Sequence, residues 1–218
     1  MKSESLVSAV LFDFGGVITA SPFEAFARYE AEMGVPTDSI RKINSTNPNN
    51  NAWAKMERSE VTLKEFCDLF EKEAQAFGLE LSGERVLGCL SGDVRPQMVR
   101  ALEILKERVT IGCITNNMKS GHGSGMSRTA DQAAIIADIM TMFEVVVESA
   151  KVGVRKPDPR IYEMACNELK VDPSDCAYLD DLGINCKPAA ALGMTAIKVV
   201  SPEQALEDLE NVVGFSLR

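Results

Sequence analysis

Residues 9–19 read AVLFDFGGVIT, and this stretch decides the fold. It begins with four apolar residues in a row, which is typical of a strand buried on both faces. The apolar run stops at one carboxylate, Asp13, and the chain then passes through Gly15 and Gly16, where the backbone can approach a ligand closely. The pattern predicts a buried strand that carries an acid at its tip, although an aspartate after a strand can also simply cap a turn.

From residue 93 onward the sequence alternates between helical patterns and short apolar strands. Strands that alternate with helices form a parallel sheet covered on both faces. The first strand fits this pattern, so we expect an α/β core made of residues 1–20 and 93–218. Strands are expected at 109–114, 143–147, 176–179 and 196–200, and helices are expected to begin at Pro96, Asp158, Pro188 and Pro202.

Residues 21–92 differ from the rest in their pattern of apolar and polar residues, which is helical and contains no strand pattern. Pro22 opens one predicted helix, a polar loop is expected at 44–51, and a short helix is expected around Trp53. Thr62 and Glu65 form a capping-box signature at the start of another helix. The segment therefore predicts an all-helical cap inserted after the first strand, where it would cover the strand tip like a lid.

Composition restricts the classes of partner. Nucleic acids and anionic membranes bind positively charged surfaces, and the formal net charge of −9 therefore argues against both classes of partner. The six cysteines lack metal-ligand spacing, and no apolar run reaches 18 residues. We expect a cytoplasmic protein that is neither exported nor inserted into a membrane, and the oligomeric state stays open.

Polar side chains follow four of the predicted strands, and in open parallel sheets ligands bind beyond these carboxyl ends. Each residue also has a plainer interpretation as a turn, a helix cap or a solvated cation. Their convergence on one edge favours a site. In chain order the residues are Asp13, then Thr115, Asn116 and Asn117, then Lys156, and finally Asp180 and Asp181.

This set suits phosphoryl transfer. Carboxylates from two strands can hold Mg²⁺, which neutralises phosphate charge so that another carboxylate can attack. Thr115 and a neighbouring amide can hydrogen-bond phosphoryl oxygens, and Lys156 can balance developing negative charge. A histidine nucleophile is disfavoured because His122 stands alone in a Gly- and Ser-rich stretch, and a serine hydrolase is disfavoured because G-x-S-x-G is missing.

At these residues the chain resembles the haloacid dehalogenase (HAD) superfamily of hydrolases. The four motifs of that family are present in order as FDFGGV, CITNN, GVRKPDPRIY and YLDDLGIN. Within the superfamily the chain is most similar to the N-terminal phosphatase-like domain of soluble epoxide hydrolases and to the related domain fused to some acyl-CoA dehydrogenases. The similarity extends over nearly the whole sequence.

The resemblance implies a Rossmann-like doubly wound core with a helical cap at 21–92. It also implies a magnesium-dependent phosphatase that acts on a small phosphorylated metabolite or a lipid phosphate through an aspartyl-phosphate on Asp13. In similar enzymes the metal is bound by the nucleophile, by a backbone carbonyl, here that of Gly15, and by a motif-four carboxylate, here Asp181 with Asp180 in support. Lys156 would be the catalytic cation, and Thr115 and Asn116 would contact the phosphate.

One position departs from the family pattern. Phosphatases of this family usually carry a second aspartate two residues after the nucleophile, as acid and base, and Gly15 stands there instead. Thr19, Ser21 and His122 are possible substitutes. Two alternatives to a phosphatase stay open: a dehalogenase, which uses the aspartate without a metal, and a catalytically weak phosphate-binding or regulatory module.

Overall fold

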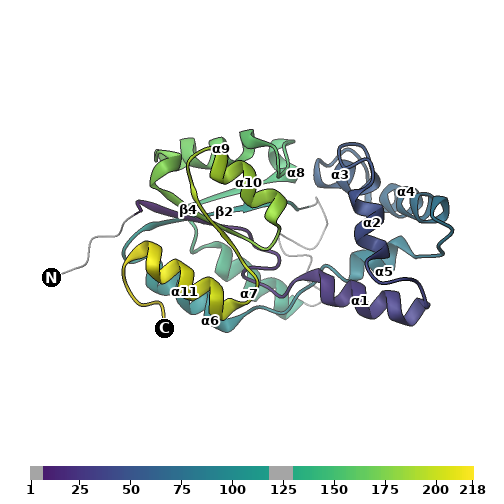
Figure 1. Ribbon diagram of the computed structural model, residues 1–218, viewed down its shortest axis with the longest axis horizontal. Coiled ribbons are helices and arrows are strands. Elements are labelled where there is room, and N and C mark those ends of the chain that lie inside the picture. Colours follow the sequence, from purple (N-terminus) through teal and green to yellow (C-terminus); the bar gives the residue numbers. More distant parts are fainter. Residues whose placement is uncertain (1–6, 118–129) are drawn as a thin grey trace.

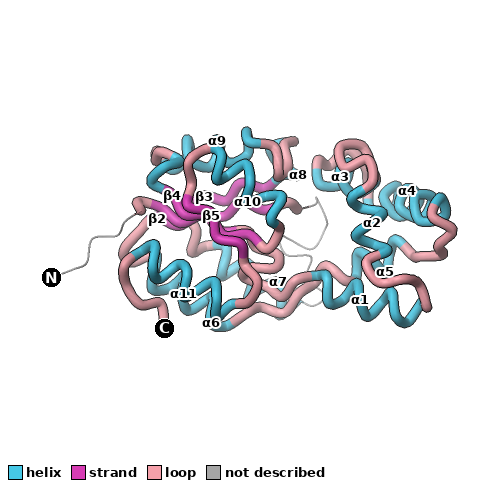
Figure 2. The backbone as a smooth tube through the Cα atoms, in the orientation of Figure 1, coloured by secondary structure: helices cyan, strands magenta, loops and turns pink. Residues whose placement is uncertain are grey.

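Five parallel strands form one sheet in the order β3–β2–β1–β4–β5. A computed structural model of the chain describes residues 7–117 and 130–218. The central strand β1 pairs with β2 on one side and with β4 on the other, so the strand order reverses at β1. Figure 2 shows strands β2, β3, β4 and β5 gathered in this sheet. The predicted parallel sheet is confirmed. The strands are β1 (Ala9–Phe12), β2 (Thr110–Thr115), β3 (Val145–Glu148), β4 (Cys176–Asp180) and β5 (Thr195–Lys198).

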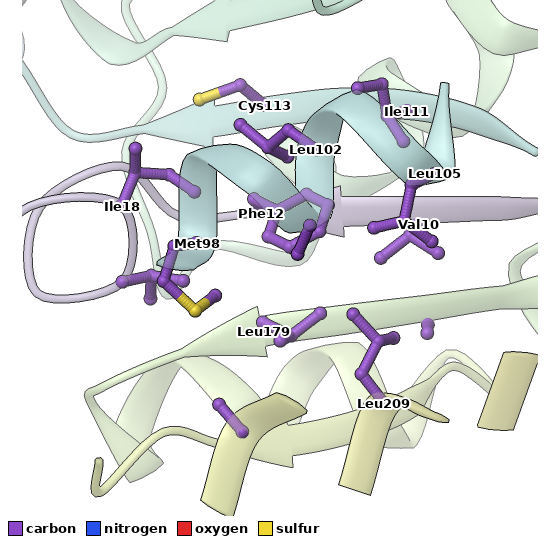
Figure 3. Close-up of a cluster of buried hydrophobic side chains, with 14 of the residues drawn as sticks. Val10, Phe12, Ile18, Met98, Leu102, Leu105, Ile111, Cys113, Leu179 and Leu209 are labelled. Atoms are coloured by element: carbon purple, nitrogen blue, oxygen red, sulfur yellow. The ribbon is translucent and has the colours of Figure 1, made fainter. Parts of the chain in front are cut away.

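Helices cover both faces of the sheet, as Figure 1 shows. Side chains of β1 alternate between the faces: Val10 and Phe12 belong to one buried apolar cluster, Ala9 and Leu11 to the other. The first cluster (Figure 3) includes residues of α6 (Pro96–Leu105), α7 (Ala130–Met140) and α11 (Pro202–Val213). The second includes residues of α9 (Pro159–Leu169) and α10 (Gly183–Ala191). This is the doubly wound, Rossmann-like arrangement, in which ligands bind where the strand order reverses.

Helix α10 begins earlier than the sequence predicts. We expected Pro188 to open it, but the helix starts at Gly183 and contains Pro188. The reason is a side chain outside the helix, because the Leu182 N–H donates to Asp180 Oδ1 at 2.8 Å and so satisfies one of the unpaired donors at the helix start. A short helix α8 (Ser149–Val152) and a 3₁₀ turn (Pro173–Asp175) complete the core.

The segment between β1 and α6 is helical throughout its regular structure and has its own buried apolar cluster. Figure 1 shows its helices grouped to one side of the sheet. The Thr62–Glu65 capping box is confirmed at the start of α4. The helix at residues 39–45 was not predicted. The five helices are α1 (Pro22–Met33), α2 (Ser39–Ser45), α3 (Ala52–Glu57), α4 (Leu63–Ala76) and α5 (Gly83–Gly88).

The chain enters and leaves this helical segment through two adjacent stretches. Thr19 and Val94 form an antiparallel bridge, and the Ala20 N–H donates to the Asp93 carbonyl at 2.8 Å. At Gly92 a Cβ atom would lie 2.3 Å from the Ala20 carbonyl oxygen, so the close approach requires glycine. Within the described part of the chain, no helix has the length and apolar character that crossing a membrane requires.

Candidate active site

Three carboxylates meet at the carboxyl edge of the sheet. Asp13 follows β1, and Asp180 ends β4 with Asp181 next to it. Because β1 and β4 are parallel neighbours, one oxygen from each of the three acids lies within 4.8 Å of the others. Gly16 makes room for this approach: its φ is +81°, and a Cβ there would lie 2.2 Å from Asp181 Oδ2. The structure thus brings together the acids that the sequence placed at separate strand ends.

Lys156 lies between two of these acids. Its Nζ atom is 2.7 Å from Asp13 Oδ1 and 2.9 Å from Asp180 Oδ2, and its side chain is only 1% exposed. Burial by itself would lower the pKa of Lys156, but the two carboxylates outweigh burial and hold that pKa above its usual range. The lysine therefore stays charged and fixes the orientation of Asp13.

One ammonium does not balance three carboxylates. Burial raises the pKa of Asp13; the Lys156 ammonium opposes that rise, and the charges of Asp180 and Asp181 add to it. Burial also raises the pKa of Asp181, again with a contribution from Asp180. Such an excess of buried negative charge is unfavourable without a further cation, and carboxylate oxygens are the ligands that Mg²⁺ prefers. The donor set therefore fits a divalent cation.

The three acids differ in how their oxygens are used. Both oxygens of Asp180 accept hydrogen bonds, with Lys156, Tyr178, Leu182 and Asn185 as the donors. Asp180 is thereby occupied in holding the lysine. No role was predicted for Tyr178 or Asn185, although both lie within the YLDDLGIN motif.

Asp13 and Asp181 each keep one oxygen available. Asp13 Oδ1 accepts the Phe14 N–H at 2.7 Å, and Asp181 Oδ2 accepts the Ser21 hydroxyl at 2.9 Å. For their other oxygens the described residues provide no hydrogen-bond donor. Asp13 and Asp181 are therefore the carboxylates that could hold Mg²⁺, and Gly15 lines the same cavity.

The last residue of β2, Thr115, and the two residues after it, Asn116 and Asn117, line the cavity. Asn116 also braces the main chain of Lys156: its Oδ1 accepts the Lys156 N–H at 2.9 Å, and its Nδ2 donates to the Lys156 carbonyl at 3.1 Å. Asn117 Nδ2 donates to Glu148 at 2.6 Å.

The position of the missing acid is open space. No heavy atom lies within 4 Å of where a Cβ of Gly15 would be, apart from its chain neighbours. Of the possible substitutes, Thr19 lines the cavity and Ser21 is engaged with Asp181. His122 lies outside the described residues.

The cavity itself has a volume of about 480 Å³ and lies between the helical segment and the sheet edge. Its far wall contains aromatic side chains, and Phe26 and Trp53 meet edge to face with ring centroids 6.3 Å apart. Arg41 stands over the Phe23 ring at 4.7 Å from the centroid and also lines the cavity. The floor is thus charged, and the far wall combines aromatic rings with the Arg41 guanidinium.

A model of the haloacid dehalogenase-like hydrolase family matches residues 7–193. The chain is 30% identical to acyl-CoA dehydrogenase family member 10 of Mus musculus over 96% of its own length and 19% of that protein. It is 27% identical to bifunctional epoxide hydrolase 2 of Sus scrofa over 96% of its own length and 39% of that protein. The chain therefore spans less than half the length of these two relatives.

Solved structures share the fold at low sequence identity. A HAD family enzyme of Bacteroides thetaiotaomicron, in complex with magnesium and inorganic phosphate, matches with a TM-score of 0.56 and 19% identity over 88% of this chain and 93% of that one. The L-2-haloacid dehalogenase of Xanthobacter autotrophicus matches with a TM-score of 0.60 and 17% identity over 94% of this chain and 82% of that one.

Proposed function

The chain belongs to the haloacid dehalogenase-like hydrolases, the family that its four motifs predicted, and we propose that within this family it is a magnesium-dependent phosphatase. The observation that carries the proposal is the cluster of Asp13, Asp180 and Asp181 around the buried Lys156 ammonium at the cavity. Phosphate esters are anionic, so a site this rich in carboxylates can admit them only with a bound cation.

We assign the metal to Asp13, Asp181 and the carbonyl of Gly15, with Asp180 in support. When bound, Mg²⁺ supplies the positive charge that offsets the phosphate. A carboxylate oxygen of Asp13 attacks phosphorus as the ester P–O bond breaks, which gives an aspartyl-phosphate and an alkoxide that must take up a proton. Water then attacks that phosphorus, and inorganic phosphate leaves as the Asp13 carboxylate is restored.

The other residues prepare this reaction. Lys156 Nζ favours the ionised form of Asp13 and orients it, and its charge balances the charge that develops on the phosphoryl group. We assign phosphate contacts to Thr115 and Asn116. Gly15 offers no proton, so the alkoxide would depend on water or another group, and substrates with good leaving groups should react best.

The walls of the cavity point to the class of substrate. Residues 21–92, which we propose to be a cap domain, contribute Phe23, Phe26 and Trp53 to those walls. A phosphorylated metabolite with an apolar part, or a lipid phosphate, would place its phosphate on the charged floor and its apolar part against these rings. We also propose a cytoplasmic location, which the six free cysteines support.

Hydrolysis of 4-nitrophenyl phosphate tests the proposal. We expect turnover that requires Mg²⁺ and that Asp13→Asn abolishes without loss of folding, because the substitution removes the nucleophile and keeps the shape. Circular dichroism and thermal unfolding serve as the folding control. A folded Asp13→Asn variant that retains most of the turnover would rule out the mechanism. Halide release from 2-chloropropionate without metal would instead identify a dehalogenase.

A further inference from the structure

Glu57, the last residue of α3, is a cap carboxylate buried against the core. Only 8% of the residue is exposed. Three side chains donate to its carboxylate: Trp53 Nε1 at 3.1 Å from within the cap, Asn116 Nδ2 at 3.3 Å from the core, and Arg155 Nε, also from the core, in a short ion pair. No role was predicted for Glu57 from the sequence.

The main chain around Glu57 is fastened to the core as well. Ser149 Oγ donates to the Glu57 carbonyl at 2.8 Å, and Ser59 Oγ donates to the Ala150 carbonyl at 3.1 Å. Figure 1 shows α3 beside α8, where Ser149 and Ala150 lie. Glu57 therefore lies at the junction where the cap meets the core next to the cavity.

The two core partners of Glu57 lead directly to the catalytic lysine. Asn116 holds both the N–H and the carbonyl of Lys156, at 2.9 and 3.1 Å. Arg155 is the residue before Lys156 in the chain. The Lys156 ammonium in turn contacts Asp13 at 2.7 Å. A continuous series of polar contacts thus joins a cap carboxylate to the nucleophile.

We propose that Glu57 is a positioning residue, through which the cap, when seated on the core, fixes Asn116 and Lys156 in the geometry that Asp13 needs. This inference rests on the proposed phosphatase function. If the cap moves away, Asn116 and Arg155 lose their shared acceptor, and the main chain of Lys156 loses part of its brace. A displacement of about 1 Å in such a group can reduce the rate by about 10²-fold.

The kinetic test uses Glu57→Gln, with Glu60→Gln as the matched control. Glu60 is also a cap glutamate paired with an arginine, Arg58, but its side chain is 48% exposed and its partner belongs to the cap rather than to the core. With 4-nitrophenyl phosphate we expect Glu57→Gln to lower kcat by roughly 10- to 100-fold with KM within about 3-fold, because positioning acts on the transition state. A purely structural role would leave kcat of the folded fraction unchanged, and that result would overturn the inference.

A second readout needs no turnover. The Lys156 N–H donates to Asn116, so amide hydrogen exchange in a peptide that spans Lys156 reports the brace directly. We expect exchange there to be faster in Glu57→Gln than in the wild type or Glu60→Gln. Unchanged exchange would refute the coupling. If the wild type shows no phosphatase turnover, the proposed function is refuted. The exchange comparison still tests whether Glu57 is coupled to the main chain of Lys156. If Glu57→Gln does not fold, Glu57→Asp, which withdraws the carboxylate by one methylene, takes its place in both tests.

Discussion

Gly15→Asp should increase turnover, because it restores a carboxyl group at the position where similar phosphatases carry their acid and base. The structure leaves room for it: apart from chain neighbours, no heavy atom lies within 4 Å of the Cβ that would be added. The φ angle of Gly15 lies outside the left-handed region, so a side chain causes no backbone strain there. The new side chain would start on the wall of the cavity, and the Gly15 carbonyl would remain available to the metal.

The size of the gain follows from general acid–base catalysis, which contributes about 10²- to 10⁴-fold in rate. That range corresponds to about 2.7 to 5.4 kcal/mol of transition-state stabilisation. The new carboxyl group joins a site in which burial already raises the pKa values of Asp13 and Asp181, and the charge of Asp180 adds to both rises. Its own pKa should also be raised, which suits a group that must first donate a proton. We therefore expect a gain of about 10²-fold for a poor leaving group and a smaller gain for 4-nitrophenol.

The assay compares the wild type, Gly15→Asp and Gly15→Asn on an alkyl phosphate and on 4-nitrophenyl phosphate at saturating Mg²⁺. Gly15→Asn has nearly the same shape but cannot exchange a proton, so it separates acid–base chemistry from simple filling of the space. The reasoning fails if folded Gly15→Asp, shown by calorimetry to bind Mg²⁺, is no faster than Gly15→Asn on the alkyl phosphate. In that case another group already moves the proton, or the cap limits the rate.

Three further outcomes are expected. First, burial raises the pKa values of Asp13 and Asp181, so protonation of these acids stabilises the metal-free fold below the raised values, and this contribution is lost as the pH rises through them. Mg²⁺ needs both acids ionised. The increase in Tm that Mg²⁺ causes in thermal unfolding should therefore be smaller at about pH 5 than at about pH 8. An equal increase at both pH values would contradict the assigned metal ligands. Second, Gly16→Ala should lower stability and Mg²⁺ affinity, measured by urea unfolding and calorimetry, because its Cβ would lie 2.2 Å from Asp181 Oδ2 at a φ of +81°; wild-type affinity would show that the turn adapts. Third, Phe66→Ala should destabilise the protein by about 3 to 5 kcal/mol in urea unfolding, because the ring is fully buried in the cap cluster; a loss below about 1 kcal/mol would mean that the cap core is loosely packed.

The sheet and the position of the site could be predicted because local patterns determine them. The run of residues 9–12 identified the central strand, and parallel strands necessarily bring their carboxyl ends to one edge. Asp13, Lys156 and Asp180 are far apart in the chain, yet each ends or follows a strand or its connection, so topology alone places them together. The observed bounds of most strands differ from the predicted bounds by one or two residues. This difference does not change which edge of the sheet carries the acids.

The features that the sequence did not reveal depend on contacts between distant residues. Helix α2 begins after Asp38 because the Glu30 carboxylate, eight and ten residues away, accepts the N–H groups of Asp38 and Ile40. Asp38 precedes the helix and is a residue type that often caps one, but it makes no side-chain cap bond here and has a φ of +63°. Glu57 was missed for the same reason, because its core partners Asn116 and Arg155 lie 59 and 98 residues away.

The arrangement of the acids also bears on the choice between phosphatase and dehalogenase. A dehalogenase that works without metal needs Asp13 ionised and one cation to orient it, and Lys156 already fulfils that need. Asp180 is accounted for as well, because its oxygens hold the lysine. Among the described residues, Asp181 accepts one hydroxyl contact, from Ser21, and its charge raises the pKa of the nucleophile, which would weaken a metal-free attack. The residue becomes useful only when a cation lies between it and Asp13, and this favours phosphoryl transfer.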